Sequence, residues 1–356
     1  MTTPLEINFW IVIYRFKFRP YRRRFVRTVS TSHGKWDIRD GIILYLTDES
    51  GRVGWGEIAP ISWFGSETIE QALDFCRQLP AEITDETIFS ISDELPACQF
   101  GFESAWEMCK ENAKSERRGD TENEIHEFPA SPHPRVPVSS FLSYSALLPA
   151  GEAALNQWES LWQQGYRTFK WKIGVDAIAN ELKIFELLTQ TLPATSKLRL
   201  DANGGLSYEE ANLWLWTCDN LQANREPAPE IEFIEQPLPV EQFQGMLELS
   251  MCYGTAIALD ESVATLAQLL ACYQQGWREI FVIKPGIIGS PSRLRKFCQQ
   301  HEIDVVFSSV FETAIARQAA LQLAAELSRN NRAVGFGIDH FFEQDDTWLQ
   351  SLWKNL

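Results

Sequence analysis

The chain has 356 residues, 45% of them apolar, which suits one large domain or two medium ones with buried cores. Its net charge of −16 disfavours nucleic acid or an anionic membrane as the main partner. Seven cysteines without a CxxC spacing are typical of a reducing compartment. No run is long enough to span a membrane, and arginines interrupt the apolar start of the chain. The sequence therefore predicts no signal peptide and a cytoplasmic protein.

The first strands are predicted within residues 7–46. Aromatic and basic residues alternate over 14–19, as in a strand with one buried face. A second run, 40–46, leads through the turn signal 48–51 into 53–57, which predicts a hairpin. Helices are expected next, at Thr68–Leu79 and Cys98–Lys114. Together these elements predict an α+β domain.

Arginines are concentrated between these strands, in the segment Tyr21–Phe25 and at Arg27. A polar stretch through His33–Lys35 follows, and the simplest interpretation of the whole segment is a solvated basic loop. Farther along, Ser115–Pro137 is charged and then proline-rich, so it is expected to be an exposed connection between two domains.

Eight strand-like runs follow, separated by seven helical segments that include Ser207–Leu221 and Thr313–Ser328. The runs are Val136–Tyr144, Thr168–Ile173, Lys197–Asp201, Ile231–Glu235, Thr255–Asp260, Glu279–Lys284, Asp304–Val310 and Ala333–Ile338. One strand and one helix in about 30 residues is the length of a βαβ unit. The alternation predicts an α/β barrel of parallel strands, whose C-terminal ends all open onto one face.

Charged clusters stand at the C-terminal ends of five consecutive runs, 24 to 34 residues apart. They are Lys170-Trp171-Lys172, Asp201-Ala202-Asn203, Glu235-Gln236-Pro237, Asp260-Glu261-Ser262 and Lys284-Pro285-Gly286. Alone, each has an ordinary explanation as a solvated strand face, a helix cap or a turn. Their common place at parallel strand ends instead predicts that three carboxylates and three lysines meet in one pocket.

The residue types in this pocket indicate its chemistry. Carboxylates from three strands repel one another unless a cation lies between them, and an all-oxygen ligand set favours a hard divalent ion such as Mg2+, with Mn2+ as a substitute. Asp201, Glu235 and Asp260 are the candidate ligands. The lysines are the candidate bases. Lys170 and Lys172 share one face of their strand, so the Lys170 ammonium would lower the pKa of Lys172 towards neutrality.

These motifs resemble the enolase superfamily, in its muconate-lactonising branch, over most of the chain. The resemblance implies that Lys172 and Lys284 flank a small carboxylate substrate and that the three carboxylates bind Mg2+. It implies a (β/α)7β TIM-like barrel over residues 131–339 and an α+β capping domain over 1–130, to which 340–356 return. It also implies that the arginine-rich loop closes over the substrate.

Other side chains near the strand ends are interpreted from their phase along the strand or from their place at its end. Arg199 and Asn203 should point into the barrel, where Arg199 would pair with a carboxylate near the metal. Ser308 and Ser309 end the seventh run; helix capping is their simplest role, and binding of a substrate carboxylate or hydroxyl is the second. Trp171 should pack against the outer helices.

Members of the superfamily share the removal of a proton α to a carboxylate. Within the branch, the serine pair followed by Glu312-Thr313, the run Gly335–Asp339 and the arginine-rich loop most resemble the o-succinylbenzoate synthase family. That family dehydrates a cyclohexadiene carboxylate on the route to menaquinone or phylloquinone. The resemblance implies that Lys172 takes the α-proton and returns it to the departing hydroxyl, while Lys284 stabilises the enediolate by its charge.

N-acylamino acid racemase and dipeptide epimerase are alternatives, since Lys172 and Lys284 could act as bases on opposite faces. Dipeptide epimerases resembling this branch usually carry Asp-x-Asp at the eighth strand, whereas Asp339 is followed here by His340 and Phe341. A catalytically silent binding protein would have been favoured by the loss of a ligand or a lysine, and none is lost. The sequence leaves the oligomeric state open.

Overall fold

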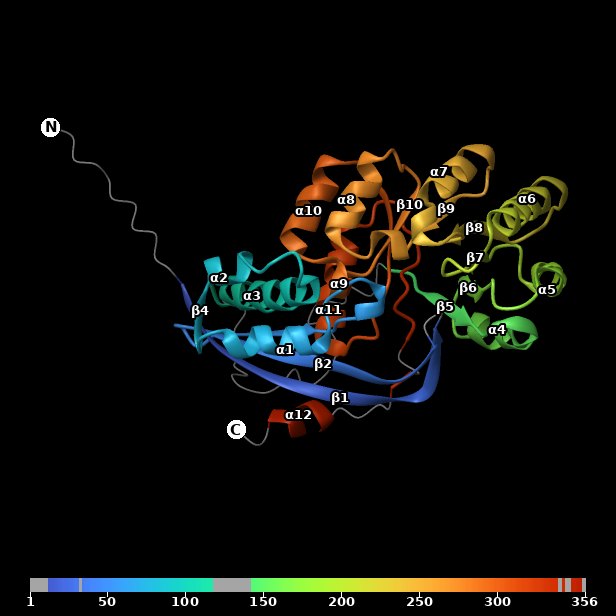
Figure 1. The fold of residues 1–356 in the computed structure, drawn as a ribbon. Helices are drawn as coiled ribbons and strands as arrows, with labels where there is room; N and C mark the ends of the chain where they lie inside the picture. The colour runs from blue at the N-terminus through green and yellow to red at the C-terminus, as the bar shows by residue number, and fades with distance from the viewer. Residues whose placement is uncertain (1–11, 32–33, 118–141, 339–340, 343–346, 354–356) are drawn as a thin grey trace.

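The computed structural model contains two sheets with their helices (Figure 1). The residues it describes are 12–31, 34–117, 142–338, 341–342 and 347–353. An antiparallel sheet of four strands comes first in the chain, in blue, and a parallel sheet of seven strands follows, from green to red. Within these residues, no helix combines the length and the apolar character that crossing a membrane requires.

The N-terminal sheet has the strand order β3-β2-β1-β4, and α1 and α3 cover one of its faces. β2 buries Leu44 and Leu46 against these helices. Gly54 and Gly56 allow β3 to approach α3, because a Cβ at either position would lie about 2 Å from a carbonyl oxygen of that helix. The elements are β1 (Ile13–Thr31), β2 (Gly34–Asp48), β3 (Val53–Ile58), η1 (Ser62–Phe64), α1 (Ile69–Gln78), β4 (Glu82–Thr84), α2 (Asp85–Phe89) and α3 (Pro96–Arg117).

The arginine-rich segment is part of a strand, so the prediction of a basic loop is wrong. β1 continues through it and pairs with β2, with Arg22 opposite Asp40. Tyr21 and Phe25 are buried on the same face, as residues four apart in a strand should be. Arg23 lies on that face too, over the rings of two aromatic residues near the C-terminus. Arginines on both faces hide the alternation that would have revealed the strand.

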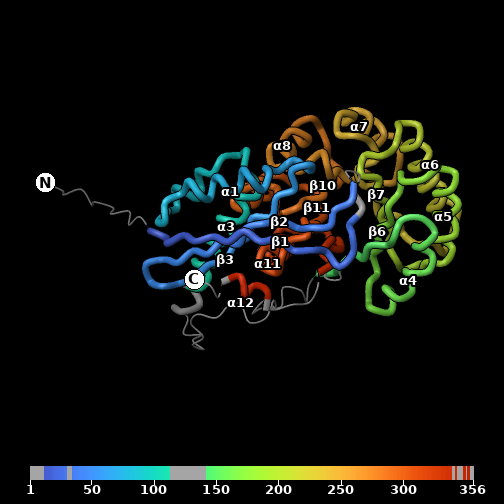
Figure 2. The backbone as a smooth tube through the Cα atoms, turned by 60° about the horizontal axis from the view of Figure 1, so that its bottom comes forward, coloured from blue at the N-terminus to red at the C-terminus, as the bar shows by residue number. Residues whose placement is uncertain are grey.

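The parallel sheet follows the chain strictly, in the order β5 to β11, and its helices lie on the outside (Figures 1 and 2). The strands are β5 (Ser145–Leu148), β6 (Thr168–Lys172), β7 (Lys197–Asp201), β8 (Glu230–Glu235), β9 (Ile257–Leu259), β10 (Ile280–Ile283) and β11 (Asp304–Phe307). The helices are η3 (Gly151–Ala153), α4 (Ala154–Gln163), α5 (Ile178–Thr191), α6 (Tyr208–Asn224), η4 (Val240–Gln242), α7 (Phe243–Cys252), η5 (Glu261–Val263), α8 (Leu266–Gln274), α9 (Pro285–Ile288), α10 (Pro291–Gln300) and α11 (Ala314–Leu327). The predicted TIM-like barrel with an α+β capping domain is confirmed as the fold class.

The first and last predicted barrel strands differ from the prediction. The first begins later, at Ser145, and residues 136–141 of the predicted run lie outside the described residues. The last run, 333–338, forms two isolated bridges, from Val334 towards β5 and from Gly335 towards β11. Backbone hydrogen bonds of 2.8 to 3.1 Å on both sides of these two residues close the ring. One short extended segment therefore replaces a full eighth strand.

The C-terminal helix α12 (Thr347–Trp353) lies against β1, on the opposite side of the sheet from α1 and α3 (Figure 1). The expected domain boundaries at 130/131 and 339/340, and the Ser115–Pro137 connection apart from its first three residues, lie outside the described residues. The boundaries stay predictions.

Two cores hold the barrel together. A small one inside the ring is formed by Phe233, Ala258, Ile280, Val282 and Val306, and it fills the space below the strand C-termini. A large one lies between strands and helices. There Trp171 is fully buried, with its ring 6.3 Å from that of a tryptophan in α6, so its predicted packing role is confirmed. The strand ends that carry the lysines and carboxylates are thus fixed from both sides.

Candidate active site

The strand register brings the charged clusters together at one end of the barrel. Lys172 is aligned with Asp201 across β6 and β7, and Asp201 is aligned with Glu235 across β7 and β8. Asp260 and Lys284 directly follow β9 and β10 at the same end. β6 and β10 are four strands apart in a ring closed by an eighth segment, so the lysines of the two strands lie on opposite sides of the opening.

Lys170 binds two of the carboxylates. Its Nζ lies 2.8 Å from Asp201 Oδ2 and 2.7 Å from Glu235 Oε1, and the side chain is mostly buried. Burial alone lowers the pKa of Lys170, but the charges of Asp201, Glu235 and Asp260 outweigh it and raise the pKa. Lys170 is therefore held as a cation and acts as a counter-ion to the carboxylates.

The carboxylates are nevertheless short of positive charge. Burial raises the pKa of Glu235 and of Asp260, while Lys170 and Lys284 act in the opposite direction. Burial also raises the pKa of Glu261, next in the chain, and Glu261 Oε2 has no hydrogen-bond partner among the described residues. Such an acid-rich, desolvated cluster favours a further cation.

The two lysines on opposite sides of the opening differ in their contacts. Lys284 forms an ion pair with Asp260, and its Nζ lies 4.0 Å from the centre of the Phe64 ring in η1 of the N-terminal region. Lys172 is partly exposed and makes no hydrogen bond or ion pair within the described part of the chain. Phe64 was missed in the sequence; its only signal is an aromatic pair in a short segment between Pro60 and Gly65.

Two residues inside the charged motifs, Gln236 and Glu261, have roles that their sequence pattern does not reveal. Gln236 is fully buried, and its Oε1 accepts hydrogen bonds from the backbone N–H groups of Asp260 (3.0 Å) and Ser262 (3.2 Å). It thereby fixes the turn that presents Asp260. Glu261 accepts a hydrogen bond from Asn203 Nδ2 at 3.1 Å, so Asn203 does point towards the site, as expected. The sequence signal for Gln236 and Glu261 was their presence in the Glu-Gln-Pro and Asp-Glu-Ser motifs.

Arg199 does not have the partner that was expected. Its Nε lies 2.6 Å from Glu232 Oε2, and the other oxygen of Glu232 lies 2.7 Å from Arg332 Nη1. Arg332 also binds Asp304 at the start of β11. The expected pairing with a carboxylate near the metal is wrong, because the long side chain reaches back towards the strand N-termini. Burial opposes the ionisation of Glu232, but the two arginines outweigh it and lower its pKa.

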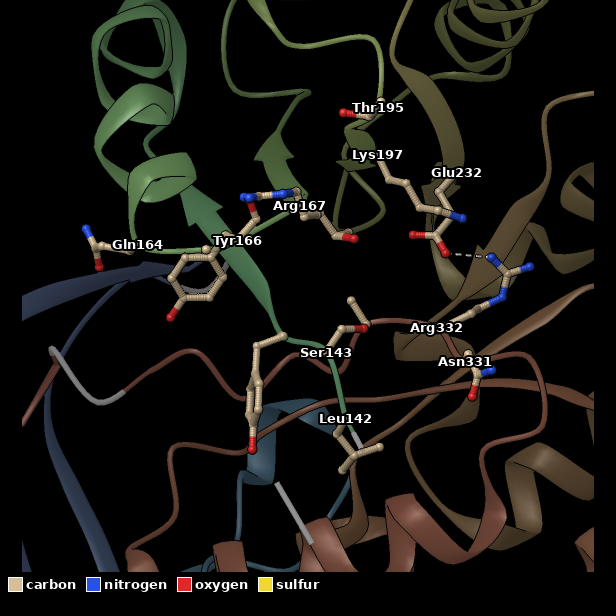
Figure 3. Close-up of a pocket in the computed structure, with 14 residues that line it drawn as sticks. Leu142, Ser143, Gln164, Tyr166, Arg167, Thr195, Lys197, Glu232, Asn331 and Arg332 are labelled. Atoms are coloured by element: carbon tan, nitrogen blue, oxygen red, sulfur yellow. Dashed lines mark hydrogen bonds and ion pairs between the residues drawn. The ribbon is translucent and has the colours of Figure 1, made fainter. Parts of the chain in front are cut away.

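This second ion cluster borders a cavity of about 550 Å³ (Figure 3). Lys197 and Thr168, the first residues of β7 and β6, line the cavity together with Glu232 and Arg332. The cavity is therefore at the N-terminal ends of the strands, opposite the lysines and metal-ligand candidates.

The serine pair after β11 does not cap the following helix. Thr313 is the N-cap of α11, since the helix begins only at Ala314. Ser309 Oγ donates to Glu312 Oε2 at 2.8 Å and accepts from Phe311 N at 2.9 Å, which orders the connecting loop. The capping interpretation of the serines is wrong. Ser308, partly exposed at the strand end beside Gly335, keeps its candidacy as a substrate contact.

The types of donor at the site, rather than their spacing in this structure, fit a divalent metal ion. Within the residues that the structure describes, no three acidic, histidine or cysteine side chains are grouped closely enough to hold one. The ammonium groups of Lys170 and Lys284 lie against the carboxylates. Three buried carboxylates on adjacent strand ends and the unpaired oxygen of Glu261 are a set of hard oxygen donors, which matches Mg2+.

Comparison with known proteins places these residues in a family. Residues 153–351 match the family described as Enolase C-terminal domain-like, and residues 13–109 match MenC, N-terminal domain. The chain is 39% identical over 329 residues to o-succinylbenzoate synthase of Thermosynechococcus vestitus, which covers 92% of this chain and 93% of that protein.

Solved structures agree with these sequence matches. O-succinylbenzoate synthase of Thermosynechococcus elongatus, complexed with Mg in the active site, has a TM-score of 0.80 at 37% identity, covering 96% of this chain and 100% of that one. L-Ala-D/L-Glu epimerase of Bacillus subtilis has a TM-score of 0.72 at 21% identity, covering 93% and 91%, a likeness that concerns the fold alone. The chain therefore belongs to the enolase superfamily and, within it, to the MenC family of o-succinylbenzoate synthases.

Proposed function

We propose that this protein is an o-succinylbenzoate synthase, a lyase that dehydrates 2-succinyl-6-hydroxy-2,4-cyclohexadiene-1-carboxylate to 2-succinylbenzoate in menaquinone or phylloquinone biosynthesis. The main support for this proposal is the 39% sequence identity to such an enzyme across both the capping sheet and the barrel. The cluster of lysines and carboxylates at the barrel mouth supports it, because proton removal next to a carboxylate needs both a base and an electrostatic stabiliser.

We assign the metal site to Asp201, Glu235 and Asp260, for Mg2+ with Mn2+ as a substitute. When bound, the ion supplies positive charge that binds the substrate carboxylate and lowers the cost of charge developing on it. The raised pKa values of Glu235 and Asp260 support this assignment, because the ionised forms lack compensating charge without a further cation. Lys170 is the permanent counter-ion that keeps Asp201 and Glu235 oriented.

We assign the base to Lys172. It is the lysine at the barrel mouth without an ion-pair partner among the described residues, so its amino group is not held by a carboxylate of the protein. Lys172 Nζ takes the proton from the carbon that bears the carboxylate, and the electron pair of that C–H bond moves onto the carboxylate, from which it returns into the ring as the hydroxyl leaves. The ammonium then gives the proton to the leaving hydroxyl, the C–O bond breaks, and water and the aromatic product result.

Lys284 is assigned to the opposite side of the substrate. Its ammonium, held between Asp260 and the Phe64 ring, is placed to stabilise negative charge on the reacting carboxylate. Ser308 is the best-placed of the candidate substrate contacts, whereas Ser309 and Asn203 also serve hydrogen bonds within the protein. The cytoplasmic location, the absence of a nucleic-acid partner and the oligomeric state stay predictions or open questions from the sequence.

The proposal is tested by following the diene absorbance of the cyclohexadiene carboxylate with the purified chain. Turnover that needs Mg2+ and stops with a chelator is expected. If the folded protein is inert, the synthase assignment fails. α-Proton exchange in D2O with N-acylamino acids and dipeptides then tests the racemase and epimerase alternatives, which the two opposed lysines would also serve.

A further inference from the structure

One buried carboxylate of the capping sheet is bound to the start of a barrel helix. Glu57, in β3, is fully buried. Its Oε1 accepts hydrogen bonds from Tyr21 Oη at 2.5 Å and from Thr313 N at 2.9 Å. Its Oε2 accepts from Ala316 N at 3.1 Å and from the Thr313 hydroxyl. β3 and α11 accordingly lie side by side (Figure 2).

These contacts satisfy a helix end that would otherwise be incomplete. The first N–H groups of a helix have no partner within it, and a negative charge there is favourable. The Thr313 side chain accepts from Ile315 N at 3.3 Å, and Glu57 supplies the acceptors for Thr313 N and Ala316 N. The Tyr21 ring covers Gly41, where a Cβ would lie 2.5 Å from the hydroxyl. The absence of a side chain at Gly41 thus leaves room for Tyr21 beside Glu57.

The helix end fixed by Glu57 is also the end of the loop that borders the catalytic face. This loop runs from Ser308 to Thr313 and joins β11 to α11. Phe311 has a left-handed backbone (φ 59°), which any residue but glycine adopts at a cost. Its ring lies 5.5 Å from that of Phe25 and 5.4 Å from that of Trp36, both in the β1–β2 hairpin. The capping sheet therefore holds the loop at two points.

We propose that Glu57 is a positioning residue for the reaction. By binding Thr313 and the first turn of α11, it fixes the β11–α11 loop and so sets where Ser308 and Phe311 stand at the barrel mouth. Glu57 touches neither the lysines nor the metal-ligand candidates in the described structure. The inference rests on the proposed function, because the role of Glu57 is tested by measuring kcat and KM for the cyclohexadiene carboxylate.

Glu103 provides a matched control. It is also a buried carboxylate of the capping region, and its Oε2 accepts from Ser292 N, at the start of α10, at 3.0 Å. It makes the same kind of cap on a neighbouring barrel helix, but among the described residues it makes no hydrogen bond to the β11–α11 loop. The loss of a cap should destabilise both variants, whereas only the Glu57 variant should displace the loop.

The experiment compares kcat, KM and the thermal midpoint of Glu57→Gln and Glu103→Gln. Misplacing substrate contacts by about 1 Å can cost up to about a hundredfold. Glu57→Gln is therefore expected to raise KM about tenfold with a smaller change in kcat. Glu103→Gln should lower the midpoint while KM stays within about twofold. A Glu57→Gln enzyme with unchanged kcat and KM overturns the proposal, as does an equal KM rise in both variants.

A double variant separates positioning from general destabilisation. If Glu57 acts through the loop, adding Glu57→Gln to Ser308→Ala should raise KM by less than the same change does in the wild type; simple multiplication of the two effects would contradict this.

Should Glu57→Gln fail to fold, Thr313→Val removes one donor from the same contact and should also raise KM. Unfolding of both variants would assign the contact to stability alone. If the wild-type protein does not turn over the cyclohexadiene carboxylate, the result contradicts the proposed function and not the role of Glu57.

Discussion

The two ends of the barrel each carry a buried cluster of charges, and the clusters differ in their balance. At the N-terminal end, two arginines face two carboxylates: Arg199, Arg332, Glu232 and Asp304. At the C-terminal end, two paired lysines, Lys170 and Lys284, face three buried carboxylates and a partly buried one. The buried carboxylates are Asp201, Glu235 and Asp260, and the partly buried one is Glu261. The pKa of Glu232 is lowered in the balanced cluster and that of Glu235 is raised in the acid-rich one. We therefore propose that the balanced cluster serves stability and that the acid-rich cluster binds a cation and the substrate.

The largest expected effect is the fall in kcat when Lys172, the proposed base at the acid-rich C-terminal end of the barrel, is replaced. Lys172→Ala should lower kcat by about a thousandfold, the range expected for a general acid–base residue, because no other lysine at the mouth is free of a carboxylate partner in the described structure. Steady-state kinetics on the diene measures it, and the thermal midpoint should stay near that of the wild type. A variant that keeps a tenth of the activity would refute Lys172 as the base.

A smaller loss of activity is expected at the metal site. Glu235→Gln removes a charge whose burial is unfavourable, so the metal-free protein should be as stable as the wild type or more so. Turnover should fall about a hundredfold, since the cation contributes several kcal/mol. Kinetics at increasing Mg2+ and thermal unfolding measure both quantities. A large fall in stability with little change in turnover would instead give Glu235 a structural role.

The opposite result is expected at the balanced end. Glu232→Gln leaves Arg199 and Arg332 without their shared carboxylate, and breaking a buried pair in this way costs about 3 kcal/mol. Denaturant unfolding should show this loss, while kcat and KM of the folded fraction stay within about threefold of the wild type. A catalytic defect without a stability defect would show that the two ends are not separate in role.

The smallest effect concerns pH. The folded pKa of Glu232 is lowered, so its stabilising contribution is complete above the unfolded value near 4.5 and is lost as pH falls through the folded value. The folded pKa of Glu235 is raised, so its ionisation costs stability as pH rises from 4.5 through the folded value. In metal-free protein, the stability deficit of Glu232→Gln should therefore shrink as pH falls below 4.5, and any stability advantage of Glu235→Gln should grow as pH rises above 4.5. Unfolding free energies between pH 3.5 and 7 check both signs.

The sequence predicted the acid-rich end better than the balanced one, for a physical reason. Lys172, Asp201 and Glu235 are placed by the strand period and by the common direction of parallel strands, and both are readable locally. The partner of Arg199 depends on a register shift between β7 and β8 and on Arg332, more than 100 residues away. Contacts between distant segments leave no local pattern.

The capping sheet shows the same limit. The hairpin turn and α1 followed from local signals, and both are confirmed. The strand through Tyr21–Phe25 was missed because arginines occupy both of its faces, and the one inside is compensated by aromatic rings from the C-terminal region. Phe64 reaches Lys284 only through the way the two sheets pack, which no short motif encodes.

The most direct measurement is calorimetric titration of Mg2+ into the metal-free protein and into the Glu235→Gln and Glu232→Gln variants. The contrast between the two ends predicts one Mg2+ site in the wild type, a site lost in Glu235→Gln and a site retained in the folded Glu232→Gln protein. Binding that survives Glu235→Gln, or no binding in the wild type, would contradict the assignment of the acid-rich cluster as the metal and catalytic site.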